Sequence, residues 1–92
     1  MRMRRLGNSG LKVSEVGLGC NNFGMRIDEK QTARVVDAAI DAGVTLFDTA
    51  DVYGGTKSEE FLGKALGKKR SQIVLATKFG MAVGGDPTKK GG

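Results

Sequence analysis

The chain has 92 residues, of which 39% are hydrophobic and 27% are charged, and its net charge is +5. These values exclude an intrinsically disordered chain, and this length allows at most one domain. The basic residues lie in small scattered clusters with few aromatic residues nearby. The charge therefore indicates a solvated face or attraction to an anionic cofactor, rather than nucleic-acid binding.

The first predicted element is a β-hairpin. Residues 2–6 and 11–14 are short candidate strands on either side of the turn cluster Gly-Asn-Ser-Gly at residues 7–10. Apolar and polar residues alternate in the second strand, so one face of the hairpin should be half buried. A further strand is predicted over residues 16–20, where two glycines suggest close approach of another backbone or of a ligand.

A first helix is predicted over residues 28–42. Asp28 and Gln31 have the spacing of a capping box, and Gly43 is placed to end the helix. The apolar stripe of this helix comprises Thr32, Val35, Val36, Ala39 and Ile40. The β-branched and aromatic residues that follow predict a strand over residues 44–48.

A second helix is predicted over residues 57–66, with Thr56 and Glu59 as its capping residues. Its inner face comprises Phe61, Leu62, Ala65 and Leu66. The unbroken apolar run within residues 73–78 predicts a strand that is buried on both faces. Residues 79–92 are rich in glycine and predict a loop or a frayed tail.

The order of these elements is a hairpin followed by β, α, β, α and β. This alternation predicts an α/β fold in which parallel strands are joined by right-handed crossover connections. We expect the three strands after the hairpin to be adjacent and in sequence order, with both helices on one side.

Two phosphate-binding motifs nearly match and fail. Residues 17–22 begin like a dinucleotide-binding fingerprint, but Asn22 stands where the third glycine belongs. Lys57 and Ser58 resemble the end of a P-loop, but Thr56 precedes them where that motif has glycine. The sequence therefore predicts neither of these nucleotide sites.

Three chemically distinctive residues follow the ends of predicted strands. Asp48 and Lys78 each close a strand, and Tyr53, the only tyrosine in the chain, lies in the loop after Asp48. Neighbouring strands lie about 5 Å apart, so these side chains should meet at one edge of the sheet. An ammonium beside a phenol stabilises the phenolate, and such a phenol can donate a proton to an oxygen that gains negative charge. Spacing alone also allows a structural salt bridge between strand ends, or a helix-capping Asp and a surface Tyr.

Three segments of the sequence resemble the aldo-keto reductase family. They are residues 17–20 (Gly-Leu-Gly-Cys), residues 47–54 (Phe-Asp-Thr-Ala-Asp-Val-Tyr-Gly) with Glu59 following, and residues 76–80 (Ala-Thr-Lys-Phe-Gly). Together these segments extend over nearly the whole chain. The resemblance implies the N-terminal part of a (β/α)8 TIM barrel that is preceded by a β-hairpin.

The resemblance also implies a reaction, which is the reduction of aldehydes or ketones to alcohols, or its reverse. NADPH would supply the hydride, with NADH less favoured, and the substrate would be a small carbonyl compound. Tyr53 would be the general acid, Lys78 would make that phenol more acidic, and Asp48 would pair with Lys78. The residues implied to lie near the cofactor are Gly19, Cys20, Asn21 and Asp48.

One feature departs from the family pattern. The family's fourth catalytic residue is a histidine, and this chain has none. A complete barrel needs about 250 residues, so residues 1–92 would be an N-terminal segment of a single barrel domain. Leu18, Leu46 and Leu75 would be among the residues that face the barrel interior. Two other interpretations remain, which are a non-catalytic binding subunit of this fold and an inactive truncated fragment.

The sequence predicts neither a membrane partner nor a metal site. No apolar run approaches the roughly 20 residues that span a bilayer, and the basic N-terminus lacks the apolar segment of a secretory signal. The single Cys20 cannot form an internal disulfide, which fits a reducing cytoplasm. The oligomeric state cannot be predicted from these features.

Overall fold

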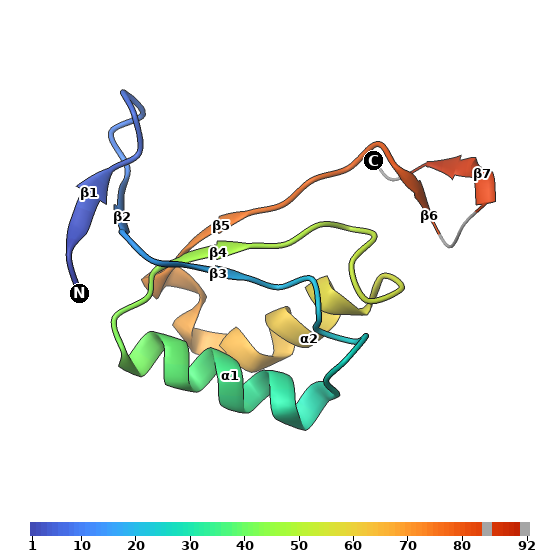
Figure 1. Cartoon of the computed structure of the whole chain (residues 1–92), viewed down its shortest axis with the longest axis horizontal. Helices are drawn as coiled ribbons and strands as arrows, with labels where there is room; N and C mark the ends of the chain where they lie inside the picture. Colours follow the sequence, from blue (N-terminus) through green and yellow to red (C-terminus); the bar gives the residue numbers. More distant parts are fainter. Residues whose placement is uncertain (84–85, 91–92) are drawn as a thin grey trace.

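Residues 1–83 and 86–90 are described by a computed structural model, in which a layer of strands lies over two helices (Figure 1). The chain begins with β1 (Met3–Arg5), β2 (Lys12–Ser14), β3 (Gly17–Gly19) and α1 (Glu29–Asp41). It continues with β4 (Leu46–Asp48), α2 (Lys57–Leu66), the 3-10 helix η1 (Gly67–Gln72) and β5 (Val74–Ala76). Two short strands follow, β6 (Ala82–Val83) and β7 (Asp86–Lys90). Among the described residues, no helix combines the length and the hydrophobicity that a bilayer-spanning segment needs.

The central sheet has the predicted topology. Strands β3, β4 and β5 are parallel and lie in sequence order. Gly19, Asp48 and Ala76 are aligned side by side at its carboxyl edge. Both helices lie on the same side of the sheet and pack against each other (Figure 1). Strands inside and helices outside is the arrangement from which a (β/α)8 barrel is built.

Alternation along the strands decides which residues face the helices. Phe47 is fully buried in the core, and Leu18 and Leu75 are aligned with it and pack against the same core. The prediction that Leu18 and Leu75 face the barrel interior is therefore wrong, because successive side chains on a strand point to opposite faces. Leu46 precedes Phe47 and thus points to the face away from the helices, as predicted.

The hydrophobic core fills the space between the sheet and the helices. Its buried residues are Cys20, Phe23, Val36, Val44, Phe47, Leu62, Leu66 and Ile73. The predicted inner faces of the helices are largely confirmed, with Ala39, Ile40 and Ala65 packed against this core. Phe61 is one exception, because it is half buried and lines a pocket instead of packing against the core. Val35 is the other, because it lies at the border of the apolar stripe of α1 and is 36% exposed.

Helix α1 begins and ends as predicted. The Asp28 side chain accepts a hydrogen bond from the Gln31 backbone N–H at 2.8 Å, and the Gln31 side chain accepts one from the Asp28 N–H at 3.0 Å. These two bonds satisfy backbone donors that the start of a helix leaves unpaired. Gly43 follows the helix with φ at 90°, the left-handed conformation in which glycine commonly ends a helix.

Helix α2 begins differently from the prediction. Thr56 is the N-cap residue, but its φ is 77° and its side chain makes no capping hydrogen bond. A side-chain cap requires extended backbone at this position, which the left-handed Thr56 lacks. The carbonyls of Gly54 and Tyr53 accept from the first two N–H groups of the helix instead. Glu59 does not cap the helix either, since its carboxylate accepts a hydrogen bond from the Thr77 hydroxyl at 2.7 Å.

Strand β5 is less buried than its sequence predicts. Its residues are half buried to exposed, although the apolar run indicated burial on both faces. The reason is that the helices cover one face, whereas no second layer covers the other face among the described residues.

The glycine-rich tail also differs from its prediction. Within residues 79–92, strands β6 and β7 pair antiparallel, so the expectation of a loop is wrong for these two strands. Residues 84–85 and 91–92 of that prediction lie outside the described residues.

The N-terminal hairpin is confirmed and is tied to the central sheet. Strands β1 and β2 pair antiparallel, with Met3 opposite Ser14. The Ser14 N–H donates to the Thr45 hydroxyl at 2.9 Å, and the Thr45 N–H donates to the Ser14 hydroxyl at 2.8 Å. The hairpin is therefore attached just before β4 starts, at the end of the sheet opposite Asp48.

We predict that residues 1–92 alone fold marginally or aggregate, and that they neither bind NADPH tightly nor reduce a carbonyl. In the described part of the chain, β3 and β5 each pair along one edge only, and Phe79 and Met81 are 75% and 65% exposed. Open strand edges offer unpaired backbone groups to other chains. A thermal melt and a fluorescence titration with NADPH test this. A cooperative monomeric melt with micromolar NADPH binding would contradict it.

Candidate active site

The three predicted side chains converge at the carboxyl edge of the sheet. Asp48 is the last residue of β4, Lys78 follows β5 by two residues, and Tyr53 lies in the loop between β4 and α2. The Lys78 ammonium lies 2.5 Å from an Asp48 carboxylate oxygen and 5.1 Å from the centroid of the Tyr53 ring. It also donates to the Thr49 carbonyl oxygen at 2.7 Å. The side chains therefore meet as their positions at parallel strand ends predict.

Charge at this edge favours the protonated lysine. The hydrogen bond to the Asp48 carboxylate raises the pKa of Lys78, partial desolvation opposes this rise, and Tyr53 adds to it. The Asp48 and Lys78 side chains are 57% and 49% exposed, so water screens their attraction and the pair contributes little to stability within this chain. Its evident consequence is a fixed cation beside the phenol ring of Tyr53.

Backbone hydrogen bonds extend the sheet beyond its assigned strands and fix the strand ends. The Thr49 N–H donates to the Ala76 carbonyl at 2.8 Å, and the Asp51 N–H donates to the Lys78 carbonyl at 3.1 Å. On the other side of β4, the Cys20 N–H donates to the Asp48 carbonyl at 2.9 Å. The backbone around the candidate site is therefore part of the sheet and not a free loop.

The residues expected near a nicotinamide cofactor differ in what they can offer. Gly19 is exposed beside Asp48, and the nearest atom to a Cβ built there is the Asn21 side-chain oxygen, 3.8 Å away. The face of Gly19 is thus open to a flat ring, and the exposed Asn21 offers an amide beside it. Cys20 is different, because the whole residue is buried in the core and its backbone N–H and carbonyl are hydrogen-bonded within the chain, so it presents no exposed group to a ligand. The open face, amide and carboxylate fit a nicotinamide riboside.

Two parts of this region were missed by the sequence reasoning. Thr49 and Ser58 are fully buried, and their hydroxyls are 2.8 Å apart. Gly54 lies so close to the loop after β3 that a Cβ on it would overlap the Phe23 carbonyl oxygen. Ser58 carried a signal, because a small polar residue stands beside the apolar stripe of α2, but the close approach of Gly54 has no local signature.

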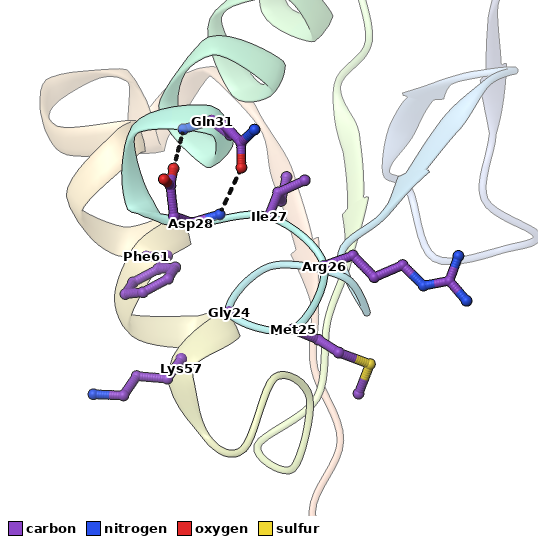
Figure 2. A pocket seen from close by; sticks show the side chains of 8 residues that line it. All are labelled: Gly24, Met25, Arg26, Ile27, Asp28, Gln31, Lys57 and Phe61. Atoms are coloured by element: carbon purple, nitrogen blue, oxygen red, sulfur yellow. Dashed lines mark hydrogen bonds between the residues drawn. The ribbon is translucent and has the colours of Figure 1, made fainter.

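A pocket of about 400 Å³ opens near the first turns of α1 and α2, separate from these three side chains (Figure 2). It is lined by Gly24, Met25, Arg26, Ile27, Asp28, Gln31, Lys57 and Phe61. Figure 2 shows the capping pair Asp28 and Gln31 on the α1 side of this pocket and Phe61 on the α2 side. Asp48, Tyr53 and Lys78 do not line it, so the pocket and the candidate active site are different places. No cluster of metal-binding side chains occurs among the residues that the structure describes.

Comparison with known proteins defines the class to which the chain belongs. The model of the aldo/keto reductase family matches residues 15–91. Over 80 residues the chain is 44% identical to "Uncharacterized oxidoreductase YqkF" of Bacillus subtilis, covering 87% of this chain and 26% of that protein. Over 83 residues it is 41% identical to "Probable voltage-gated potassium channel subunit beta" of Oryza sativa, covering 86% of this chain and 25% of that protein.

A solved structure agrees with this match. Aldo-keto reductase AKR11C1 from Bacillus halodurans, in its holo form, superposes with a TM-score of 0.82 at 42% identity, covering 99% of this chain and 29% of that one. The chain belongs to the aldo-keto reductase family. Its fold is the N-terminal part of a (β/α)8 barrel preceded by a β-hairpin. The chain spans about a quarter of the length of the curated relatives named above.

We predict that Gly54→Ala destabilises the complete protein carrying this segment by about 2 kcal/mol more than Gly55→Ala does. The two glycines have φ values of 62° and 61°, so the left-handed strain of an alanine is matched. They differ because a Cβ at Gly54 meets the Phe23 backbone, whereas a Cβ at Gly55 has nothing within 4 Å. Urea unfolding of both variants measures this difference. Equal losses of stability would show that the loop moves aside without cost.

A second prediction concerns pH. Burial raises the pKa of the Cys20 thiol from 9.0 to about 11. The folded state therefore holds this proton more tightly, and the resulting stabilisation is complete below pH 9 and is lost as the pH rises from 9 to about 11. The unsubstituted protein should thus exceed Cys20→Ala in urea midpoint by less at pH 10 than at pH 8. A difference that does not change between these pH values would contradict the prediction.

Proposed function

We propose that the complete protein carrying this segment reduces aldehydes or ketones to alcohols, with Tyr53 as the general acid. The observation that carries this proposal is the Lys78 ammonium, which lies beside the Tyr53 ring and is held by Asp48. A fixed cation beside a phenol makes it a better proton donor by stabilising the phenolate that remains. The best acceptor for such a proton is an oxygen that gains negative charge, as a carbonyl oxygen does during reduction.

In this proposal the cofactor is NADPH, with NADH as the less favoured alternative, and when bound it supplies the hydride. The open face of Gly19 and the amide of Asn21 would receive the nicotinamide and ribose, together with Asp48. Lys78 holds its proton and orients the phenol, and Asp48 keeps Lys78 charged and in place. A small-molecule carbonyl compound would place its oxygen within reach of the Tyr53 hydroxyl.

The proposal also concerns the domain. Residues 1–92 would be the N-terminal segment of a single barrel, and segments outside these residues would complete the site. Three observations support this, namely the open edges of β3 and β5, the exposed Phe79, and the buried Asp51 carboxylate that has no hydrogen-bond partner among the described residues. Buried polar groups in complete folds nearly always have a partner.

A binding subunit is the second candidate, and the similarity to a protein named as a potassium channel β subunit favours it. The presence of Asp48, Tyr53 and Lys78 does not separate the two candidates, because a binding subunit can keep these residues. Turnover separates them. An enzyme consumes NADPH when a carbonyl substrate is added, whereas a binding subunit holds the cofactor without net consumption.

We predict that Tyr53→Phe abolishes carbonyl reduction in the complete protein and leaves the Kd for NADPH nearly unchanged, because only the proton donor is removed. Lys78→Met should also abolish turnover, and Lys68→Met is its matched control, because Lys68 is an exposed lysine of η1. NADPH oxidation at 340 nm with a panel of aldehydes and ketones measures turnover. Unchanged turnover in Tyr53→Phe would move the acid role to another residue.

A further inference from the structure

Ser58 occupies a place where three elements of the candidate site meet. It lies in the first turn of α2, and it is fully buried together with Thr49, which follows β4, and Cys20, which follows β3. The Ser58 hydroxyl lies 2.8 Å from the Thr49 hydroxyl and donates to the Cys20 carbonyl oxygen at 2.8 Å. Buried hydroxyls with full hydrogen bonding hold their surroundings in one arrangement.

Counting protons fixes the direction of this chain of hydrogen bonds. A hydroxyl has one proton, and the Ser58 hydroxyl uses it to donate a hydrogen bond to the Cys20 carbonyl. The Thr49 hydroxyl must therefore be the donor to the Ser58 oxygen. Ser58 consequently both accepts and donates. Its removal leaves the buried Thr49 hydroxyl unpaired and takes one of two donors from the Cys20 carbonyl, which also accepts from the Phe23 N–H at 3.2 Å. That loss is costly at a site with no access to water.

Asp48, Tyr53 and Lys78 are each linked to the hydrogen bonds of Ser58 through their own backbone or through that of a neighbouring residue. The Ser58 N–H donates to the Tyr53 carbonyl at 3.1 Å. The Lys78 ammonium donates to the carbonyl of Thr49, the residue whose hydroxyl reaches Ser58. The Cys20 N–H donates to the Asp48 carbonyl, while the Cys20 carbonyl accepts from Ser58.

We propose that Ser58 is a positioning residue that sets the distance between the Tyr53 phenol and the Lys78 ammonium. Ser58 fixes the start of α2, and with it the loop that carries Tyr53, to the ends of β3 and β4. The end of β4 carries Asp48 and the Thr49 carbonyl, which both accept hydrogen bonds from the Lys78 ammonium. Ser58 itself touches neither substrate nor cofactor, because it is fully buried beneath this edge. The inference rests on the proposed function, since the positioned phenol is the proposed acid.

The test compares Ser58→Ala with Ser71→Ala in the complete protein. Ser71 is an exposed serine of η1, so the same substitution is made away from the site. Misplacing a reacting group by about 1 Å can cost 100-fold in rate, and we expect Ser58→Ala to lower kcat by about 10- to 100-fold. The Kd for NADPH should stay within about threefold, because the fully buried Ser58 presents no surface to the cofactor and the Cys20 carbonyl keeps its bond from the Phe23 N–H. Thr49→Val combined with Ser58→Ala should be no slower than Ser58→Ala alone, because the unpaired threonine hydroxyl is then removed.

A spectroscopic signal separates positioning from a structural role. In protein labelled with 13C at the tyrosine Cζ, the Tyr53 resonance is the one that disappears in Tyr53→Phe. Ser58→Ala should shift this resonance, whereas Ser71→Ala should leave it unchanged. If Ser58→Ala does not fold, Thr49→Val is tested by the same criteria. The Thr49→Val protein keeps the hydrogen bond from Ser58 to the Cys20 carbonyl and loses the hydrogen bond between the hydroxyls of residues 49 and 58.

The outcomes are distinct. If Tyr53→Phe is inactive while Ser58→Ala matches Ser71→Ala in kcat and in the Tyr53 resonance, the positioning role is wrong and the proposed function stands. If the unsubstituted protein reduces no carbonyl, the proposed function is wrong, and the Tyr53 resonance alone decides whether Ser58 places the phenol. A lower melting temperature with unchanged kcat and unchanged resonance would reduce Ser58 to a structural residue and overturn the inference.

Discussion

The register of three parallel strands is the constraint on which the rest of this structure depends. Phe47 faces the helices and is fully buried, so its neighbour Asp48 must face the other way, beside Gly19 and Ala76. A slip of β4 by one residue would place the carboxylate against the core and the phenyl ring in the open. The burial of one aromatic side chain therefore fixes the direction of the carboxylate that holds Lys78. The alternating directions of the side chains on β4 therefore couple the packing of the core to the position of the candidate catalytic carboxylate.

The second level of organisation lies in the loops after the strands. Parallel strands bring their carboxyl ends to one edge, and the loops that leave this edge are joined by backbone and hydroxyl hydrogen bonds. Gly54 permits this closeness, because any larger residue would meet the Phe23 backbone. The exposed ion pair adds little stability, whereas the buried polar contacts beneath it require exact partners. The exposed charged groups are thus held in place by uncharged, buried residues that pack tightly.

Local signals in the sequence predicted the parts of the fold that depend on neighbouring residues alone. The capping box of Asp28 and Gln31 needs only a spacing of three residues, and the glycine that ends α1 needs only its own conformation. The convergence of Asp48 with Lys78 was also accessible, because parallel topology places strand ends together. Predictions failed for the exposed β5, whose burial depends on residues distant in the sequence, and also for two local features, the left-handed Thr56 and the pairing of β6 with β7. The Leu18 and Leu75 error arose because residues in different strands were assigned a face without first fixing the register.

The reciprocal bonds between Ser14 and Thr45 have a practical consequence for handling the protein. They attach the N-terminal hairpin at the end of the sheet away from Lys78, and the turn at residues 7–10 is exposed. A surface tether or a fluorescent dye attached within this turn would sit at the amino end of the strands. An immobilised molecule would then present its carboxyl edge to the bulk solution, where small molecules arrive. The hairpin turn is therefore a suitable attachment site for single-molecule and biosensor experiments.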